Sequence, residues 1–242
     1  APLSIFDANR AISAIELYPT AVVFDLTLPA IPPQRRLHLS LAGAHQAHNA
    51  GLAIAAAQLF FQSNTNINEH SLSEDAIRTA LAKINLPGRM DQRRWRETQF
   101  IIDGAHNAQK IHALCTALSA LYPEQRFVFV VALKEGKDHH AIFTQLLPLA
   151  AQIILTRFDN HDQGMPLRAT DPYELAALLE TTMREATSTG GMSISAASVP
   201  IIVEPVVEKA LALAVQAAHA GAQSGQPLPV VVTGSLYLLA EI

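Results

Sequence analysis

The stretch Phe-Ile-Ile-Asp-Gly-Ala-His-Asn, at positions 100–107, passes from an apolar run directly into a polar turn that contains glycine. Two later stretches repeat this change: residues 127–133 lead into Lys-Glu-Gly-Lys-Asp at 134–138, and residues 230–232 lead into Thr-Gly-Ser at 233–235. Short, continuous, β-branched runs are typical of parallel strands that are buried on both faces. The sequence therefore predicts an α/β fold with a mostly parallel sheet.

The rest of the second half of the chain fits the same alternation of strands and helices. Further apolar runs lie at 153–155 and 201–203. Helical stretches are expected between the runs, near residues 107–121, 139–150, 172–186 and 205–220. The Ser/Gly-rich stretch 187–199 is expected to form a mobile surface loop.

The first part of the chain has a different pattern. Residues 21–28 and 37–42 predict two strands, which the Pro-rich stretch 29–33 links because proline cannot donate to a central strand. Residues 44–61 are rich in alanine and predict a buried helix. A second helix is expected over residues 74–84.

The sequence carries signals for both the start and the end of that second helix. Ser71 and Glu74 have the spacing of a capping box. The sequence Asn-Leu-Pro-Gly at 85–88 ends the helix, since glycine and proline disfavour its continuation. We therefore predict two domains, residues 1–85 and 86–242.

Composition and charge exclude several classes of protein. Half of the 242 residues are hydrophobic and only 16% are charged, which argues against a disordered chain, and the formal net charge of −4 argues against a net-basic nucleic-acid binder. The only cysteine, Cys115, excludes an internal disulfide and is expected to be buried and inert in a reducing compartment. No signal peptide or apolar run of about 18 residues occurs, so we expect a cytoplasmic protein with no membrane partner.

The polar segments that follow the strands predict one ligand site. In open α/β sheets, ligands bind beyond the carboxyl ends of the strands. Asp103 stands at a strand end, where a carboxylate can accept the hydroxyls of a ribose. His106 and Asn107 open a helix, where free amides favour an anion. The spacing leaves a second interpretation open, in which Asp103 and Asn107 are only helix caps.

Four motifs give the chain a resemblance to a known family. They are Asp-Gly-Ala-His-Asn at 103–107, Leu-Pro-Gly-Arg at 86–89, Thr-Gly-Ser-Leu-Tyr-Leu at 233–238 and Leu-Ala-Gly-Ala-His-Gln-Ala-His-Asn-Ala at 41–50. Together and in this order, they resemble the folylpolyglutamate and dihydrofolate synthases of the Mur ligase superfamily. The resemblance implies a Rossmann-like domain of the Mur ligase C-terminal type, preceded by the tail of the central ATPase domain.

The resemblance also implies roles for individual residues in ATP binding. Asn49 is similar to the asparagine that approaches the adenine, and Arg89 to the arginine that reaches the phosphates. Asp103 is similar to the ribose-binding aspartate, and His106 to its neighbour in the nucleotide site. For the incoming L-glutamate, the resemblance implies binding by Lys137 and Ser235.

The implied reaction is an ATP-dependent ligation. ATP phosphorylates the carboxylate of folate or dihydropteroate, and the amine of glutamate then attacks the acyl phosphate, with Mg²⁺ offsetting charge. The implied partners are therefore small molecules: folate or dihydropteroate, L-glutamate and ATP.

Departures from the family pattern limit these expectations. Ala108 stands where the family usually has proline, and Asp91 where it commonly has glutamate. No phosphate loop of the form Gly-x-x-x-x-Gly-Lys-Ser/Thr occurs in the sequence. We therefore expect a fragment that is inactive alone, and we assign it no catalytic residue and no metal ligand. The alternatives are a non-catalytic module that binds a nucleotide, an anion or a partner protein, and a fragment of a peptidoglycan-branch Mur ligase.

Three other clusters have weaker interpretations. His45 and His48 are one helical turn apart, as metal ligands can be, but polar contacts at a helix start are favoured. The pair at 139–140, His-His, is expected to be solvated. The stretch Arg-Arg-Trp-Arg at 93–96 could hold nucleic acid, but a solvated turn is favoured, so we expect no nucleic-acid partner.

Overall fold

The computed structural model describes residues 5–29, 31–63, 72–159, 168–188, 199–222 and 225–242. It divides the chain into two compact units, unit 1 (Ala1–Pro87) and unit 2 (Gly88–Ile242). None of the helices in these ranges has the length and the apolar character that crossing a membrane requires.

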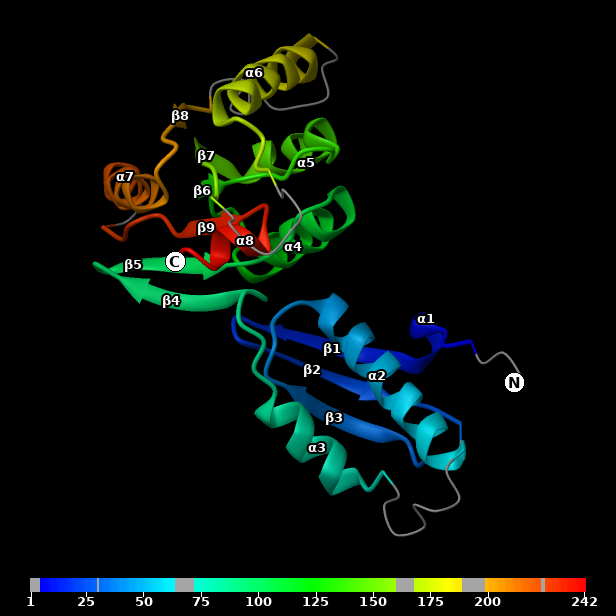
Figure 1. The fold of residues 1–242 in the computed structure, drawn as a ribbon. Coiled ribbons are helices and arrows are strands. Elements are labelled where there is room, and N and C mark those ends of the chain that lie inside the picture. The colour runs from blue at the N-terminus through cyan, green and yellow to red at the C-terminus, as the bar shows by residue number, and fades with distance from the viewer. Residues whose placement is uncertain (1–4, 30, 64–71, 160–167, 189–198, 223–224) are drawn as a thin grey trace. The chain divides into compact units, whose positions relative to one another are not determined.

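Unit 1 is a three-stranded antiparallel sheet with two long helices on one face (Figure 1). Its strands, in sheet order, are β1 (Ile12–Tyr18), β2 (Ala21–Leu26) and β3 (Gln34–Leu39), and the short helix α1 (Ala8–Ala11) precedes them. Helix α2 (Ala44–Ser63) contacts β1 and β2, whereas α3 (Glu74–Lys83) contacts β3. Alternate apolar side chains of β2 and β3 join both helices in one core, so the pleat of the sheet decides which face is covered.

The structure corrects three details of the prediction for unit 1. The second predicted strand lies at Gln34–Leu39 instead of 37–42, because Gln34 already pairs with Leu26 of β2. Helix α3 is capped by Ser73, whose Oγ accepts the amide of Ala76 at 3.2 Å, while the predicted cap Ser71 lies outside the described residues. Strand β1 was not predicted.

Unit 2 is an α/β domain built on a six-stranded sheet in the order β4-β5-β9-β6-β7-β8. The strands β5 to β9 pair in parallel, and only β4 is antiparallel to its neighbour. The bounds of the strands are β4 (Asp91–Trp95), β5 (Thr98–Ile102), β6 (Phe127–Val131), β7 (Ala150–Leu155), β8 (Ile201–Val203) and β9 (Val230–Thr233). The predicted mostly parallel sheet is therefore confirmed.

Helices cover both faces of this sheet. Helix α7 packs on one face, where alternate valines of β6 and β9 meet it in a single core cluster. Helices α4, α5 and α6 stack side by side along the other face (Figure 1). The bounds of the helices are α4 (Ala108–Leu121), α5 (His139–Leu146), α6 (Pro172–Ser188), α7 (Val207–Ala220) and α8 (Leu236–Leu239). Every residue of β6 is buried, as the continuous apolar run predicts.

The structure differs from the prediction at the end of one helix of unit 2. The helix expected over 139–150 gives way to a 3₁₀ turn at Leu147–Leu149, since Pro148 has no amide to continue the α-helix. The loop expected over 187–199 lies mostly outside the described residues.

The solvated turn predicted for the arginine-rich stretch 93–96 is wrong. Residues Asp91–Trp95 form β4, which pairs with β5 in a hairpin whose two loop residues, Arg96 and Glu97, both have positive φ angles of 48° and 63°. Such a two-residue loop matches the right-handed twist of the paired strands. Strand β4 has no apolar run, so the sequence pattern did not indicate a strand. Charged residues are common in edge strands, where they prevent association with other strands.

Cys115 lies on α4 and is half-buried, whereas the sequence predicted a buried thiol. Its Sγ donates to the backbone carbonyl of Gln145 on α5 at 3.4 Å. Burial raises the pKa of the Cys115 thiol from 9.0 to about 12. Because the thiolate is the reactive form, the thiol should be protected in the folded protein.

We predict that iodoacetamide alkylates Cys115 of the native chain at pH 8 at least about a hundredfold more slowly than in urea. A folded pKa above the ordinary value also means that the stabilisation from the neutral thiol is fully present below pH 9.0 and is lost as the pH rises towards about 12. The difference in unfolding free energy between the wild type and Cys115→Ala should therefore shrink over that range. Equal alkylation rates in the native and unfolded chains would contradict the assignment.

Candidate functional site

The carboxyl ends of three neighbouring strands form one edge of the sheet in unit 2. Strand β9 lies between β5 and β6 and is parallel to both. The polar segments that begin at Asp103, Lys134 and Gly234 therefore leave the sheet at adjacent positions on the same edge. The structure thus brings together the three segments that the sequence analysis assigned to one site.

Asp103 is the buried centre of this edge. Its side chain is only 5% exposed, and its two carboxylate oxygens accept different backbone amides. Oδ1 accepts the amide of Ala105 at 2.8 Å, and Oδ2 accepts the amide of Met90 at 2.9 Å. The carboxylate therefore ties the segment before β4 to the turn after β5. Asp103 does not cap a helix, so that part of the cap interpretation is wrong.

Backbone contacts join this turn to the end of β9. The carbonyl of Ala105 accepts the amide of Gly234 at 2.9 Å and the hydroxyl of Thr233 at 3.3 Å. Gly234 has a φ of 106°, and a Cβ on it would collide with the carbonyl oxygen of Ala132. Only glycine fits here without displacing the end of β6.

The first turn of α4 carries the other nucleotide-site candidates. Asn107 is the N-cap of α4, with Oδ1 accepting the amide of Lys110 at 2.9 Å, so its cap interpretation is confirmed. His106 is half-buried, with Nδ1 at 2.8 Å from the carbonyl of Gly104 and Nε2 at 3.3 Å from Nζ of Lys110. The sequence analysis missed Lys110, although its spacing of four residues from His106 places the two on one helical face.

Opposing effects act on the charge of Asp103. Burial has the largest effect and raises the pKa of this carboxyl group, while the amides of Ala105 and Met90 lower it. The positive charges of Arg89 and Lys110 also lower the pKa of Asp103. Within the described residues, the Arg89 side chain has no hydrogen bond or ion pair.

The loop after β6 is held by an irregular backbone pairing. The amide of Glu135 donates to the carbonyl of Arg168 at 3.1 Å, and the amide of Thr170 donates to the carbonyl of Leu133 at 2.8 Å. His139 contributes through Nε2, which lies 3.1 Å from the carbonyl of Lys134. The expectation that both histidines at 139–140 are solvated is therefore wrong for His139.

The two glutamate-site candidates differ in their environment. Lys137 lies in this loop, half-buried, and its side chain has no hydrogen bond or ion pair among the residues that the structure describes. Ser235 is only 3% exposed and caps α8, where its Oγ accepts the amide of Tyr237 at 3.1 Å. Lys137 thus has a free ammonium group, whereas Ser235 already has a structural role.

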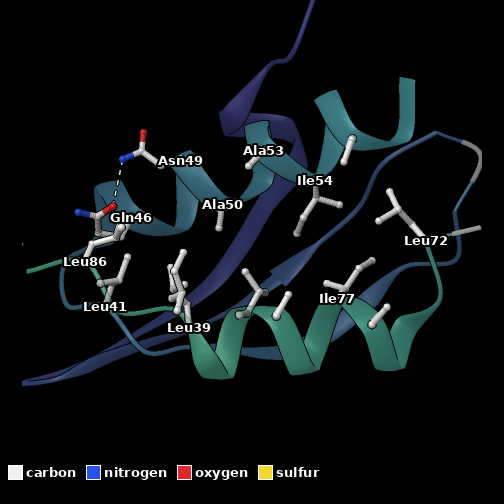
Figure 2. A pocket seen from close by; sticks show the side chains of 15 residues that line it. Leu39, Leu41, Gln46, Asn49, Ala50, Ala53, Ile54, Leu72, Ile77 and Leu86 are labelled. Carbon is white, nitrogen blue, oxygen red and sulfur yellow. Dashed lines mark hydrogen bonds between the residues drawn. The ribbon is translucent and has the colours of Figure 1, made fainter. Parts of the chain in front are cut away.

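Asn49 lies in unit 1, on α2, and is exposed. Its Nδ2 donates to Oε1 of Gln46 at 3.1 Å. These two amides stand at one end of an apolar cavity of about 550 Å³ between α2, α3 and β3, and Leu72 stands at the other end (Figure 2). The other side chains that line the cavity are aliphatic.

The described residues offer no grouping of three His, Cys, Asp or Glu side chains that could hold a metal ion. His45 and His48 lie on α2, and His140 pairs with Glu185 at 3.0 Å.

Unit 2 is thus a Rossmann-like α/β domain whose polar groups converge at the carboxyl edge of a parallel sheet. The family model described as "Dihydrofolate synthetase, C-terminal domain" matches residues 83–242. The chain therefore belongs to the dihydrofolate and folylpolyglutamate synthase family, of which it carries the C-terminal portion. This match places it in the folate branch, as the resemblance implied, and the alternative of a peptidoglycan-branch fragment is wrong.

Individual relatives agree with this assignment. The chain is 31% identical to the dihydrofolate synthetase of Saccharomyces cerevisiae over 84% of its own length and 44% of the yeast protein. A crystal structure of Mycobacterium tuberculosis folylpolyglutamate synthase, complexed with ADP and AMPPCP, is similar with a TM-score of 0.73 and 25% identity, over 94% of this chain and 45% of that one. The Lactobacillus casei folylpolyglutamate synthetase shares the fold, with a TM-score of 0.62 and 20% identity over 95% and 44% of the two chains. The chain thus spans less than half the length of each of these three relatives.

We predict that Asp103→Ala lowers the free energy of unfolding by about 2–5 kcal/mol, because it leaves two buried amides without an acceptor. Asp138→Ala is the matched control, since its exposed carboxylate accepts only the amide of Ala141 as the cap of α5 and its loss should cost about 1 kcal/mol. Urea unfolding of both variants measures the difference. A loss for Asp103→Ala no larger than for the control would contradict the central position of this carboxylate.

Proposed function

We propose that this chain is the glutamate-binding and part of the nucleotide-binding portion of an ATP-dependent ligase. The ligase joins L-glutamate to the carboxylate of folate or dihydropteroate. The observation that carries the proposal is the convergence of the family's strand-end motifs on one sheet edge of a domain that the family model matches over residues 83–242.

The proposed chemistry is the formation of an amide through an acyl phosphate. ATP transfers its γ-phosphoryl group to the acceptor carboxylate, and the glutamate nitrogen then attacks the activated carbon. A C–N bond forms, the C–O bond to phosphate breaks, and the amine loses a proton. Cationic side chains stabilise the negative charge that moves during both steps. No three His, Cys, Asp or Glu side chains of the described residues are grouped to hold a metal ion, and no residue of this chain is assigned to Mg²⁺.

For the nucleotide, we assign Arg89 to the phosphates, with Asp103 and His106 in the same part of the site. The Asp103 carboxylate has already bonded two amides, but each of its oxygens has a second lone pair that a ribose hydroxyl can use. Asn49 is assigned to the adenine. Its Oδ1 and second Nδ2 hydrogen have no described partner, and an asparagine amide can pair with the N6 and N7 edge of adenine.

For glutamate, we assign Lys137 to a carboxylate and Ser235 to a secondary contact. Lys137 has no hydrogen bond or ion pair to any described residue, and its loop has a backbone that is fixed at both ends, by Glu135 and by the Asp138 cap of α5. A positioned cation on a fixed loop suits the recognition of an anionic substrate. The hydroxyl of Ser235 can still donate its hydrogen, because its oxygen is the acceptor in the α8 cap.

The test is steady-state kinetics of the complete enzyme that contains this chain, with glutamate and ATP varied separately. We predict that Lys137→Met raises the KM for glutamate about 10- to 100-fold and leaves the KM for ATP unchanged, because it removes a charge-assisted bond. Ser235→Ala should have a smaller effect, about 2- to 10-fold, because the lost bond is neutral.

Two controls accompany this test. Lys209→Met removes an exposed lysine from the first turn of α7 and should change neither constant. The 242-residue chain by itself should show no turnover, because its sequence has no phosphate loop. A rise in the KM for ATP with none for glutamate would contradict the assignment of Lys137. Turnover by the chain alone would contradict the proposal that the reaction needs a phosphate loop outside this chain. A complete enzyme without ligase activity would favour the alternative of a non-catalytic binding module.

A further inference from the structure

His106 and Lys110 form a pair on the first turn of α4. Lys110 is four residues after His106, and side chains at this spacing lie one above the other on a helix. Nζ of Lys110 is 3.3 Å from Nε2 of His106, and both side chains are half-buried. Lys110 lies outside the Asp-Gly-Ala-His-Asn motif.

The contacts of the ring decide which nitrogen of His106 carries the proton. A carbonyl oxygen only accepts, so Nδ1 must donate to Gly104 O, which lies 2.8 Å away. A lysine ammonium only donates, so Nε2 must accept from Lys110. These partners match the tautomer that carries its hydrogen on Nδ1 and has its Nε2 lone pair towards Lys110. Both polar atoms of His106 are thus engaged within the protein.

The Lys110 ammonium, in contrast, still has donors for a ligand. One of its three N–H groups can donate to His106, and the other two have no partner among the described residues. The nearby carboxylate, Asp103, already accepts two backbone amides, while Asp91 pairs with Arg93 at 2.9 Å. Arg89 is a second cation, next to Met90, whose amide donates to Asp103 at 2.9 Å, and the Arg89 side chain has no hydrogen-bond partner among the described residues. The start of α4 therefore carries an excess of positive charge, and helix amides at such a position also favour an anion.

We propose that Lys110 binds the polyphosphate of the nucleotide together with Arg89, and that His106 is a positioning residue that holds the Lys110 ammonium in place. This inference rests on the proposed function, because it takes the nucleotide site to lie at this edge of the sheet. It changes the role of His106, whose ring then acts through Lys110 and does not touch the nucleotide.

The first experiment measures the binding of ATP and of adenosine to the complete enzyme that contains this chain, by calorimetry. Lys110→Met should weaken ATP binding about tenfold and leave adenosine binding unchanged, because only the triphosphate carries the charge. Lys110→Arg should restore most of the ATP affinity, and the matched control Lys209→Met should bind ATP like the wild type.

The second experiment is a double-mutant cycle with His106→Leu. If His106 acts through Lys110, its loss should weaken ATP binding in the wild type but have no further effect in Lys110→Met. The ¹⁵N spectrum of the histidine rings supplies a readout without ligand: the wild-type His106 should show Nδ1 protonated and Nε2 unprotonated, and Lys110→Met should shift the Nε2 signal.

The outcomes separate this inference from the proposed function. Equal ATP affinities of Lys110→Met and the wild type, or independent effects of His106 and Lys110, would overturn the inference and leave the nucleotide site intact. An ATP affinity of the complete enzyme that stays at the wild-type value in Arg89→Met, Lys110→Met and the double variant would overturn the proposed nucleotide site and the inference with it.

Discussion

The candidate site depends on one buried carboxylate. Asp103 accepts the amides of Met90 and Ala105, and the carbonyl of Ala105 in turn accepts the amide of Gly234. These bonds connect three segments that are far apart in the sequence: the start of the β4–β5 hairpin, the turn into α4 and the end of β9. A buried carboxylate is costly unless it is hydrogen-bonded, so its two amide partners are a condition for this arrangement.

The carboxyl edge of the sheet has two regions with different polar groups: the turn at Asp103 with the start of α4, and the loop after β6. Lys110 lies in the first turn of α4, and Arg89 directly precedes Met90, whose amide donates to Asp103. We propose that a phosphate binds these two cations and the amides at the start of α4. After β6, the loop with Lys137 is fixed by a separate set of backbone bonds to residues 168–170. Because β9 lies between β5 and β6, the two regions lie on the same edge of the sheet, which the proposed reaction between a phosphorylated acceptor and glutamate would require.

Features that follow from a local sequence pattern could be predicted, whereas contacts that form only when distant segments pair in the sheet could not. The apolar run of β6 identified a strand buried on both faces, and Asn107 was identifiable as a possible cap. Strand β4 was missed because an edge strand needs no apolar run. The hydrogen bond from the Met90 amide to the Asp103 carboxylate has no local sequence signal, because it forms only when β4 pairs with β5. Lys110 could have been found from its helical spacing to His106, but not its contact with the ring.

The central claim is that the carboxyl edge of β5, β9 and β6 binds the nucleotide. Amide chemical-shift mapping of the ¹⁵N-labelled 242-residue chain during an ATP titration tests it most directly, because it locates the ligand without any substitution. The account predicts that the amides of residues 88–90, 103–110 and 233–235 shift together with one saturation curve. Shifts confined to the opposite edge of the sheet, around residues 122–127 before β6, would contradict it.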